Sequence, residues 1–155
     1  MIILKELISY KNYFESIATS HVDIQGFVYH DTEEMMAGFK SKHNYPLMYL
    51  EPYSTRLQDQ ISDNYLGRKT GSLVIMKKSN SNEAPEAIEA AAETIVCDII
   101  SKILKDYQAG DLVTEINGFN YDVIDPIFVD RLYGIRLEFN FHNPLPVAYN
   151  EAKWQ

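Results

Sequence analysis

The pattern of apolar and polar residues changes period several times along the first third of the chain. Residues 2–18 carry apolar side chains at the i, i+3, i+4 spacing of a helix that covers a core. Residues 22–29 alternate instead, which predicts a first strand with a bulge at Gly26. Asp31 is then a candidate N-cap for a short helix that ends near Lys42.

The pattern over residues 45–78 predicts mainly strands. Residues 45–52 form a short apolar run bracketed by Pro46 and Pro52, which predicts a buried strand. Residues 56–66 are more polar, and their pattern fits either an extended strand or a partly exposed arm. Gly67 to Gly71 are a turn signal and the apolar run 73–76 follows, so we expect residues 56–78 to form a hairpin.

The clearest periodicity predicts one long helix over residues 84–109. Pro85 stands near its start, and Gly110 is a natural residue just after its end. At 1.5 Å per residue the helix would be about 39 Å long, whereas a domain of this size has a radius of gyration of roughly 15 Å. The helix should therefore cross the whole domain.

After Gly110 the chain returns to a period of two. Residues 112–116 and 119–124 read as strands joined by Asn117-Gly118, a strong two-residue turn signal. Residues 133–142 alternate five times in a row, which predicts the last strand. The order of elements predicts an α+β fold, with a largely antiparallel sheet packed against one long central helix and an N-terminal helix. We expect a single domain over residues 1–143 and a C-terminal arm over 144–155.

Composition and charge restrict the function without selecting one. The chain has 155 residues, of which 46% are hydrophobic, and a formal net charge of −8. An acidic chain is poorly suited to hold nucleic acid or an anionic membrane by charge. Charged residues interrupt the apolar N-terminus before an export signal forms, and no apolar run approaches the roughly 20 residues of a membrane span.

The sequence contains few candidate catalytic or metal-binding residues. Cys97 lies within the long helical pattern, so we expect a buried, inert thiol and a reducing compartment. No phosphate-binding glycine motif or nucleophile elbow is present. We therefore expect no cofactor, no metal site and no enzymatic activity. The histidines show no spacing typical of metal ligands; they are His21, His30, His43 and His142.

Two features are candidates for interaction with a partner. Positive charge gathers at Arg68, Lys69, Lys77 and Lys78, the two ends of the expected hairpin. These residues form either a solvated hairpin tip or a contact with an acidic partner or a nucleic acid backbone. The apolar tail, which includes Tyr149 and ends at the only tryptophan, Trp154, either docks on a neighbouring subunit or folds back on its own sheet.

The order of elements resembles that of the tail terminator (tail completion) and neck proteins of tailed bacteriophages. Three segments carry the likeness: the Pro-flanked strand YPLMYLEP at 45–52, the helix at 84–109, and DRLYGIRLEF at 130–139. The polar stretch 54–69 and the tail 144–155 depart from the family pattern.

The resemblance implies a structural virion protein that is assembled in the host cytoplasm. Such a protein forms a ring of six subunits, caps the tail tube and joins it to the head connector. Its sheet, hairpin and arm would make the contacts, and DNA would pass through the lumen without being bound specifically.

Two other classes of function stay open. One is a small enzyme or ligand-binding domain with a pocket between the long helix and the sheet, using a histidine such as His142. The other is an acidic adaptor that neutralises a basic protein partner.

Overall fold

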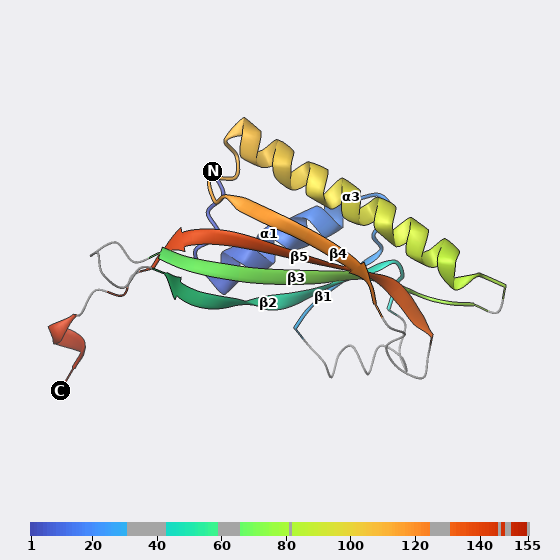
Figure 1. Ribbon diagram of the computed structural model, residues 1–155, viewed down its shortest axis with the longest axis horizontal. Helices are drawn as coiled ribbons and strands as arrows, with labels where there is room; N and C mark the ends of the chain where they lie inside the picture. Colours follow the sequence, from blue (N-terminus) through green and yellow to red (C-terminus); the bar gives the residue numbers. More distant parts are fainter. Residues whose placement is uncertain are drawn as a thin grey trace.

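A computed structural model describes residues 1–30, 43–58, 66–80, 82–124, 131–145, 147 and 150–154. Over these residues the chain forms a five-stranded sheet in the order β1-β2-β3-β5-β4. Figure 1 shows the long helix α3 running beside the sheet for much of the length of the molecule. The elements are α1 (Leu7–Ser20), β1 (Gly26–Tyr29), β2 (Leu47–Gln58), β3 (Leu66–Lys78), α3 (Pro85–Ala109), β4 (Ile116–Val123), β5 (Leu132–Pro144) and the short 3-10 helix η1 (Glu151–Lys153).

The predicted α+β class is confirmed, and the sheet is mixed. Strands β2, β3, β5 and β4 pair antiparallel, whereas β1 pairs parallel to β2. The predicted long helix is confirmed at Pro85–Ala109 and ends at Gly110, which has a φ of 78°. A left-handed residue of this kind is a common helix ending, because it lets the backbone N–H bond back to the last turn. In the described part of the chain, no helix is long and apolar enough to cross a membrane.

The main core lies between the two helices and one face of the sheet, which we call the helix face. Helix α1 contributes an aromatic cluster to it: the ring centroids of Phe14 and Phe139 are 5.0 Å apart, and those of Tyr10 and Phe141 are 5.8 Å apart. Helix α3 contributes a buried stripe that consists of Ile88, Ala92, Ile95, Val96, Ile99 and Ile103. Burial of this large apolar area provides the main driving force for folding.

The opposite face, which we call the open face, has two different halves. At one half a smaller apolar cluster is buried; it includes Leu47, Val74, Met76 and Leu132. At the other half the side chains of β3 and β5 that point away from the helices are polar, such as Thr70 and Asn140. Among the described residues, both α-helices lie on the helix face.

The N-terminal segment differs from the prediction in where its helix and strand begin. Helix α1 begins at Leu7 rather than at residue 2. Ile2 instead forms a parallel bridge beside Leu112: its N–H donates to Asp111 O at 2.6 Å, and its carbonyl accepts from Val113 N at 2.9 Å. The first strand covers only Gly26–Tyr29, the second half of the predicted range.

The turn predicted at Asn117-Gly118 is wrong, because these residues lie inside β4. Asn117 is opposite Asn140 and Asn120 is opposite Glu138, so β4 has one extra residue between these pairs. Gly118 has a φ of 63°, a conformation that glycine adopts without the steric cost of a Cβ. The dipeptide thus forms a β-bulge, which needs the same backbone conformation as a tight turn.

The turn predicted at Gly67 to Gly71 is also wrong, since both glycines lie inside β3. They leave room for neighbouring side chains: a Cβ on Gly67 would meet Leu145, and one on Gly71 would meet Phe139 and Tyr10. The hairpin expected over residues 56–78 is therefore wrong too: β3 pairs antiparallel with Leu47–Gln58, and Arg56 lies opposite Arg68. Strand β2 continues through a bulge after Glu51 to Gln58, which makes residues 56–58 part of a strand.

The expected buried thiol is wrong as well, because Cys97 is exposed. It follows Val96, which is buried in the α3 stripe, and the next residues of that stripe are at 99 and 103. A step of one residue turns the helix by about 100°, which carries Cys97 away from the sheet. Three predicted segments lie outside the described residues: the short helix at 31–42, residues 59–65 of the polar stretch 54–69, and the turn at Asp125-Pro126.

Candidate functional site

The structure does not bring the four basic candidate residues together. All four lie on β3, but Arg68 and Lys69 are near one end, and Lys77 and Lys78 are at the other. At about 3.3 Å per residue the two pairs are roughly 30 Å apart. Side chains also alternate along the strand, so Arg68 points to the open face and Lys69 to the helix face. The four residues therefore form no single patch.

Lys69 is a buried residue, with only 2% of its surface exposed. Its Nζ donates hydrogen bonds to Lys5 O at 2.7 Å and to the Tyr53 hydroxyl at 3.3 Å, and it lies 4.4 Å from the centroid of the Tyr53 ring. Burial lowers the pKa of the Lys69 ammonium. These contacts attach the N-terminal segment to β3, which is a structural role.

The other candidates have separate surroundings. Lys77 forms an ion pair with Glu83 at 2.8 Å, which connects the end of β3 to the segment before α3, and Lys78 is exposed. Trp154 follows η1, which Figure 1 shows beyond the end of the sheet, and it is 68% exposed. Tyr149 lies outside the described residues. The interface roles of Lys78, Tyr149 and Trp154 stay predictions.

The most distinctive arrangement is a row of cationic side chains on the open face. Strand register places Arg56 of β2 opposite Arg68 of β3, and Arg68 opposite His142 of β5. We call these three residues the arginine row. Both arginines are exposed and His142 is half-buried. Within the described residues, none of the three forms an ion pair or a side-chain hydrogen bond.

Several other polar side chains on the open face are paired with one another. Arg136 donates to Glu51 Oε2 at 2.9 Å and to Ser72 Oγ at 3.2 Å, and the Ser72 hydroxyl donates to the same Glu51 oxygen at 2.5 Å. Between this cluster and the arginine row, Thr70 donates to Asn140 Oδ1 at 2.9 Å. The cation of Arg136 is thus compensated within the chain.

Sequence reasoning missed Arg56 as a candidate and left His142 outside the interface. The sequence does contain a pattern that could have located this face. Alternate residues are polar in β3 at Arg68, Thr70 and Ser72, and in β5 from Arg136 to His142. Such alternation indicates a face exposed to solvent.

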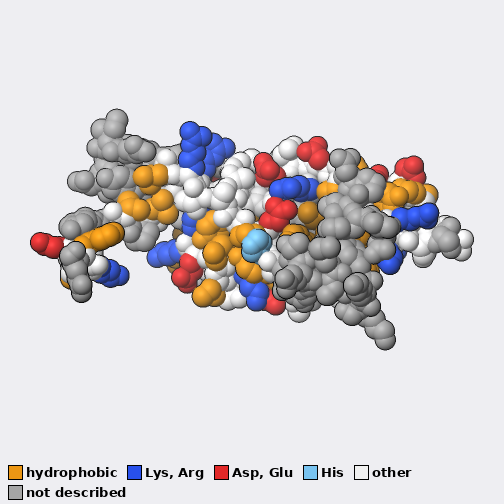
Figure 2. All heavy atoms as spheres, turned by 90° about the horizontal axis from the view of Figure 1, so that it is seen from below, with side chains coloured by type: hydrophobic (Ala, Val, Ile, Leu, Met, Phe, Trp, Pro, Cys, Tyr) orange, Lys and Arg blue, Asp and Glu red, His pale blue; other side chains and the backbone are white. Residues whose placement is uncertain are grey.

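On the surface seen in Figure 2, basic and acidic side chains are interspersed with hydrophobic ones.

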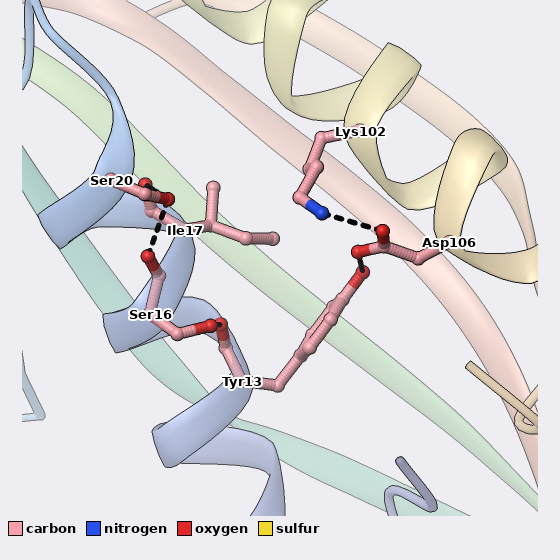
Figure 3. A network of polar contacts seen from close by, with 6 residues as sticks. All are labelled: Tyr13, Ser16, Ile17, Ser20, Lys102 and Asp106. Carbon is pink, nitrogen blue, oxygen red and sulfur yellow. Dashed lines mark hydrogen bonds and ion pairs between the residues drawn. The ribbon is translucent and has the colours of Figure 1, made fainter. Parts of the chain in front are cut away.

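One hollow holds a histidine and an aspartate at hydrogen-bond distance. Its volume is about 240 Å³, and its lining includes Ser20, His21 and Asp98. His21 Nε2 lies 3.2 Å from Asp98 Oδ2, and the N–H of Asp23 donates to His21 Nδ1 at 3.1 Å. Because Nδ1 accepts a hydrogen bond, the neutral ring carries its proton on Nε2 and directs it to Asp98. Neither nitrogen is left to take a proton from Ser20, whose hydroxyl donates to Ser16 O at 2.7 Å (Figure 3).

A second polar cluster connects the two helices (Figure 3). The Tyr13 hydroxyl donates to Asp106 Oδ2 at 3.0 Å, and Lys102 Nζ donates to Asp106 Oδ1 at 2.5 Å. Asp106 is buried, and burial, together with this carboxylate, raises the pKa of the Tyr13 hydroxyl. The cluster therefore uses its charged groups to hold α1 against α3. Among the described residues, no three His, Cys, Asp or Glu side chains gather as metal ligands.

His142 lies on the face of the sheet opposite the helices, so it does not line a pocket between the long helix and the sheet. The arginine row is consequently the candidate site, and its chemistry is that of binding an anionic surface. No protein-family model matches the chain. No curated protein matches it either.

Proposed function

We propose that this protein is a structural subunit that assembles with copies of itself into a ring. The observation that supports this proposal best is the arginine row, a group of exposed cations without acidic partners among the described residues of a chain whose net charge is −8. Exposed cations of this kind on a sheet face are suited to bind another protein surface of opposite charge.

The charge of the row favours a ring over a symmetric pair. In a symmetric dimer both subunits use the same patch, so a symmetric contact centred on the row would bring arginines of one copy against arginines of the other. A contact between two different surfaces avoids this repulsion. Repetition of such a contact closes into a ring when the rotation between subunits fits, and it otherwise forms a filament.

The resemblance to tail terminator and neck proteins supplies the biological setting of the proposal. The ring would contain six copies, lie at the end of a phage tail tube, and bind the tube protein on one side and the head connector on the other. The C-terminal arm with Trp154 would add contacts between neighbours. The acidic character of the chain suits a lumen through which DNA passes, because like charges keep the phosphate backbone from adhering.

Negative-stain electron microscopy of the purified protein tests the proposal. We expect closed rings with a central opening, and we expect co-purification with a tail tube or connector protein that is expressed together with the chain. Particles of monomer size at every concentration, with no binding to either partner, would contradict it.

A further inference from the structure

We propose that the arginine row binds the acidic outer side of α3 in a neighbouring copy of this chain. The inference rests on the proposed self-assembly and specifies which surfaces meet. The cationic surface consists of Arg56 and Arg68, with His142 at its end. The acidic surface is the first half of α3, where Glu86 is exposed and Glu89 is half-buried.

Among the described residues, no acidic side chain compensates the charge of the arginine row. Like charges directly opposite each other on neighbouring strands destabilise a sheet, and both arginines are exposed in this arrangement. On the same face, Arg136 has Glu51 as its partner at 2.9 Å. A carboxylate from outside the subunit would relieve the repulsion between Arg56 and Arg68 and provide bidentate hydrogen bonds. The row thus has the charge and the donors to accept an acidic protein surface.

The distribution of charge favours a second copy as the occupant. The chain has 22 Asp and Glu residues against 14 Lys and Arg residues, so each further copy offers more acidic than basic side chains to the row. Helix α3 packs on the helix face, whereas the arginine row lies on the open face. The two charged surfaces of one subunit are therefore separate surfaces, which is what a head-to-tail contact uses.

A nucleic acid is a weaker candidate for this site. Binding of a phosphate backbone depends on many lysines and arginines in a stripe. The row has two arginines and one histidine, and the next charged cluster on the open face contains Glu51. The row therefore matches a pair of carboxylates better than an extended polyanion.

Charge reversal tests the assignment. The double variant Arg56→Glu, Arg68→Glu places carboxylates on the row and should weaken assembly at least tenfold, because like charges then face each other across the contact. Light scattering should report the 17.9 kDa mass of one chain, whereas circular dichroism should stay unchanged. Lys5→Glu, Lys105→Glu is the matched control: it likewise replaces two exposed cations by two carboxylates, at positions outside the arginine row, and it should assemble like the wild type.

A complementary variant identifies the partner surface. Glu86→Lys, Glu89→Lys should also fail to assemble alone, because cations then meet the arginine row. An equal mixture of the two double variants should restore assembly, since every contact in an alternating ring again joins opposite charges. A wild-type protein that is monomeric contradicts the proposed function itself.

The other results of these assembly experiments test only which two surfaces of the subunit meet. A wild type that assembles while Arg56→Glu, Arg68→Glu assembles equally well would overturn the role of the row. Failure of the mixture to assemble would overturn the role of α3. If instead the wild type binds a 30-base-pair DNA duplex and the arginine variant loses that binding with no change in assembly, the row is a nucleic acid site.

Discussion

Arg56 and Arg68 lie directly opposite each other in the antiparallel β2–β3 ladder, and both side chains are exposed. Strand pairing within one subunit brings the two cations together, and no acidic side chain among the described residues forms an ion pair with either. Arg136, on the same face, is paired with Glu51. This difference in compensation distinguishes the arginine row from Arg136.

Lys69 should be dispensable for assembly although it is next to Arg68 in sequence. Lys69→Met replaces the buried cation by an apolar side chain of similar length and removes the donor to Lys5 O and to the Tyr53 hydroxyl, a loss that costs about 1–3 kcal/mol. We expect the free energy of unfolding in urea to fall by about this amount and the assembled mass to stay the same. Loss of assembly in this variant would contradict the assignment of Lys69 to the interior.

Asp106 should contribute strongly to the stability of the helix pair. Asp106→Ala removes the acceptor of the Tyr13 hydroxyl and leaves that buried donor unsatisfied, which costs about 1–3 kcal/mol. We expect a loss of about 2 kcal/mol in urea unfolding. Lys11→Ala, which breaks the exposed Lys11–Glu15 ion pair, is the control and should change stability by less than about 0.5 kcal/mol. Equal effects of the two substitutions would argue against a structural role of the Tyr13–Asp106 bond.

Alkaline pH should destabilise the protein through its buried tyrosines. Burial raises the pKa of Tyr10 far above the ordinary value near 10, so above pH 10 the unfolded chain loses a proton that the folded chain keeps. Stability is therefore fully present below pH 10 and falls above it, by about 1.4 kcal/mol per pH unit for each such tyrosine. Unfolding of Tyr10→Phe between pH 9 and 11 should show a slope shallower by this amount. Identical slopes for wild type and variant would contradict the buried, protonated state of Tyr10.

Two glycines should respond differently to alanine. A Cβ on Gly134 would collide with the carbonyl oxygen of Ile75 on the neighbouring strand, and this backbone atom cannot move aside without breaking the ladder. We expect Gly134→Ala to cost about 3 kcal/mol or more. Gly110 faces open space but has a φ of 78°, so Gly110→Ala should cost only about 1–2 kcal/mol. Thermal unfolding compares the two, and an equal effect would contradict the close strand contact at Gly134.

The elements with long, unambiguous periodicity could be predicted from the sequence. Helix α3 and strand β5 each repeat their apolar pattern several times, so the pattern itself determines the element. The glycine signals failed because a glycine that permits a turn also permits a bulge, as at Gly118, or a close side-chain contact, as at Gly67. Local sequence does not distinguish these uses, since the neighbouring strand decides between them.

The candidate site could be predicted only in part. Arg68 was singled out by its charge, but its partners in the row come from β2 and β5, and only the register of three strands places them together. The interior position of Lys69 depends on the alternation of a strand whose beginning was interpreted as a turn. An error of this kind changes which face each side chain occupies.

Light scattering on the purified wild-type protein, over a range of protein concentrations, tests self-assembly most directly. The account predicts a uniform mass several times the 17.9 kDa of one chain, with a shift toward smaller species as salt screens the charged contact. A mass of one chain at every concentration and at low salt would contradict it.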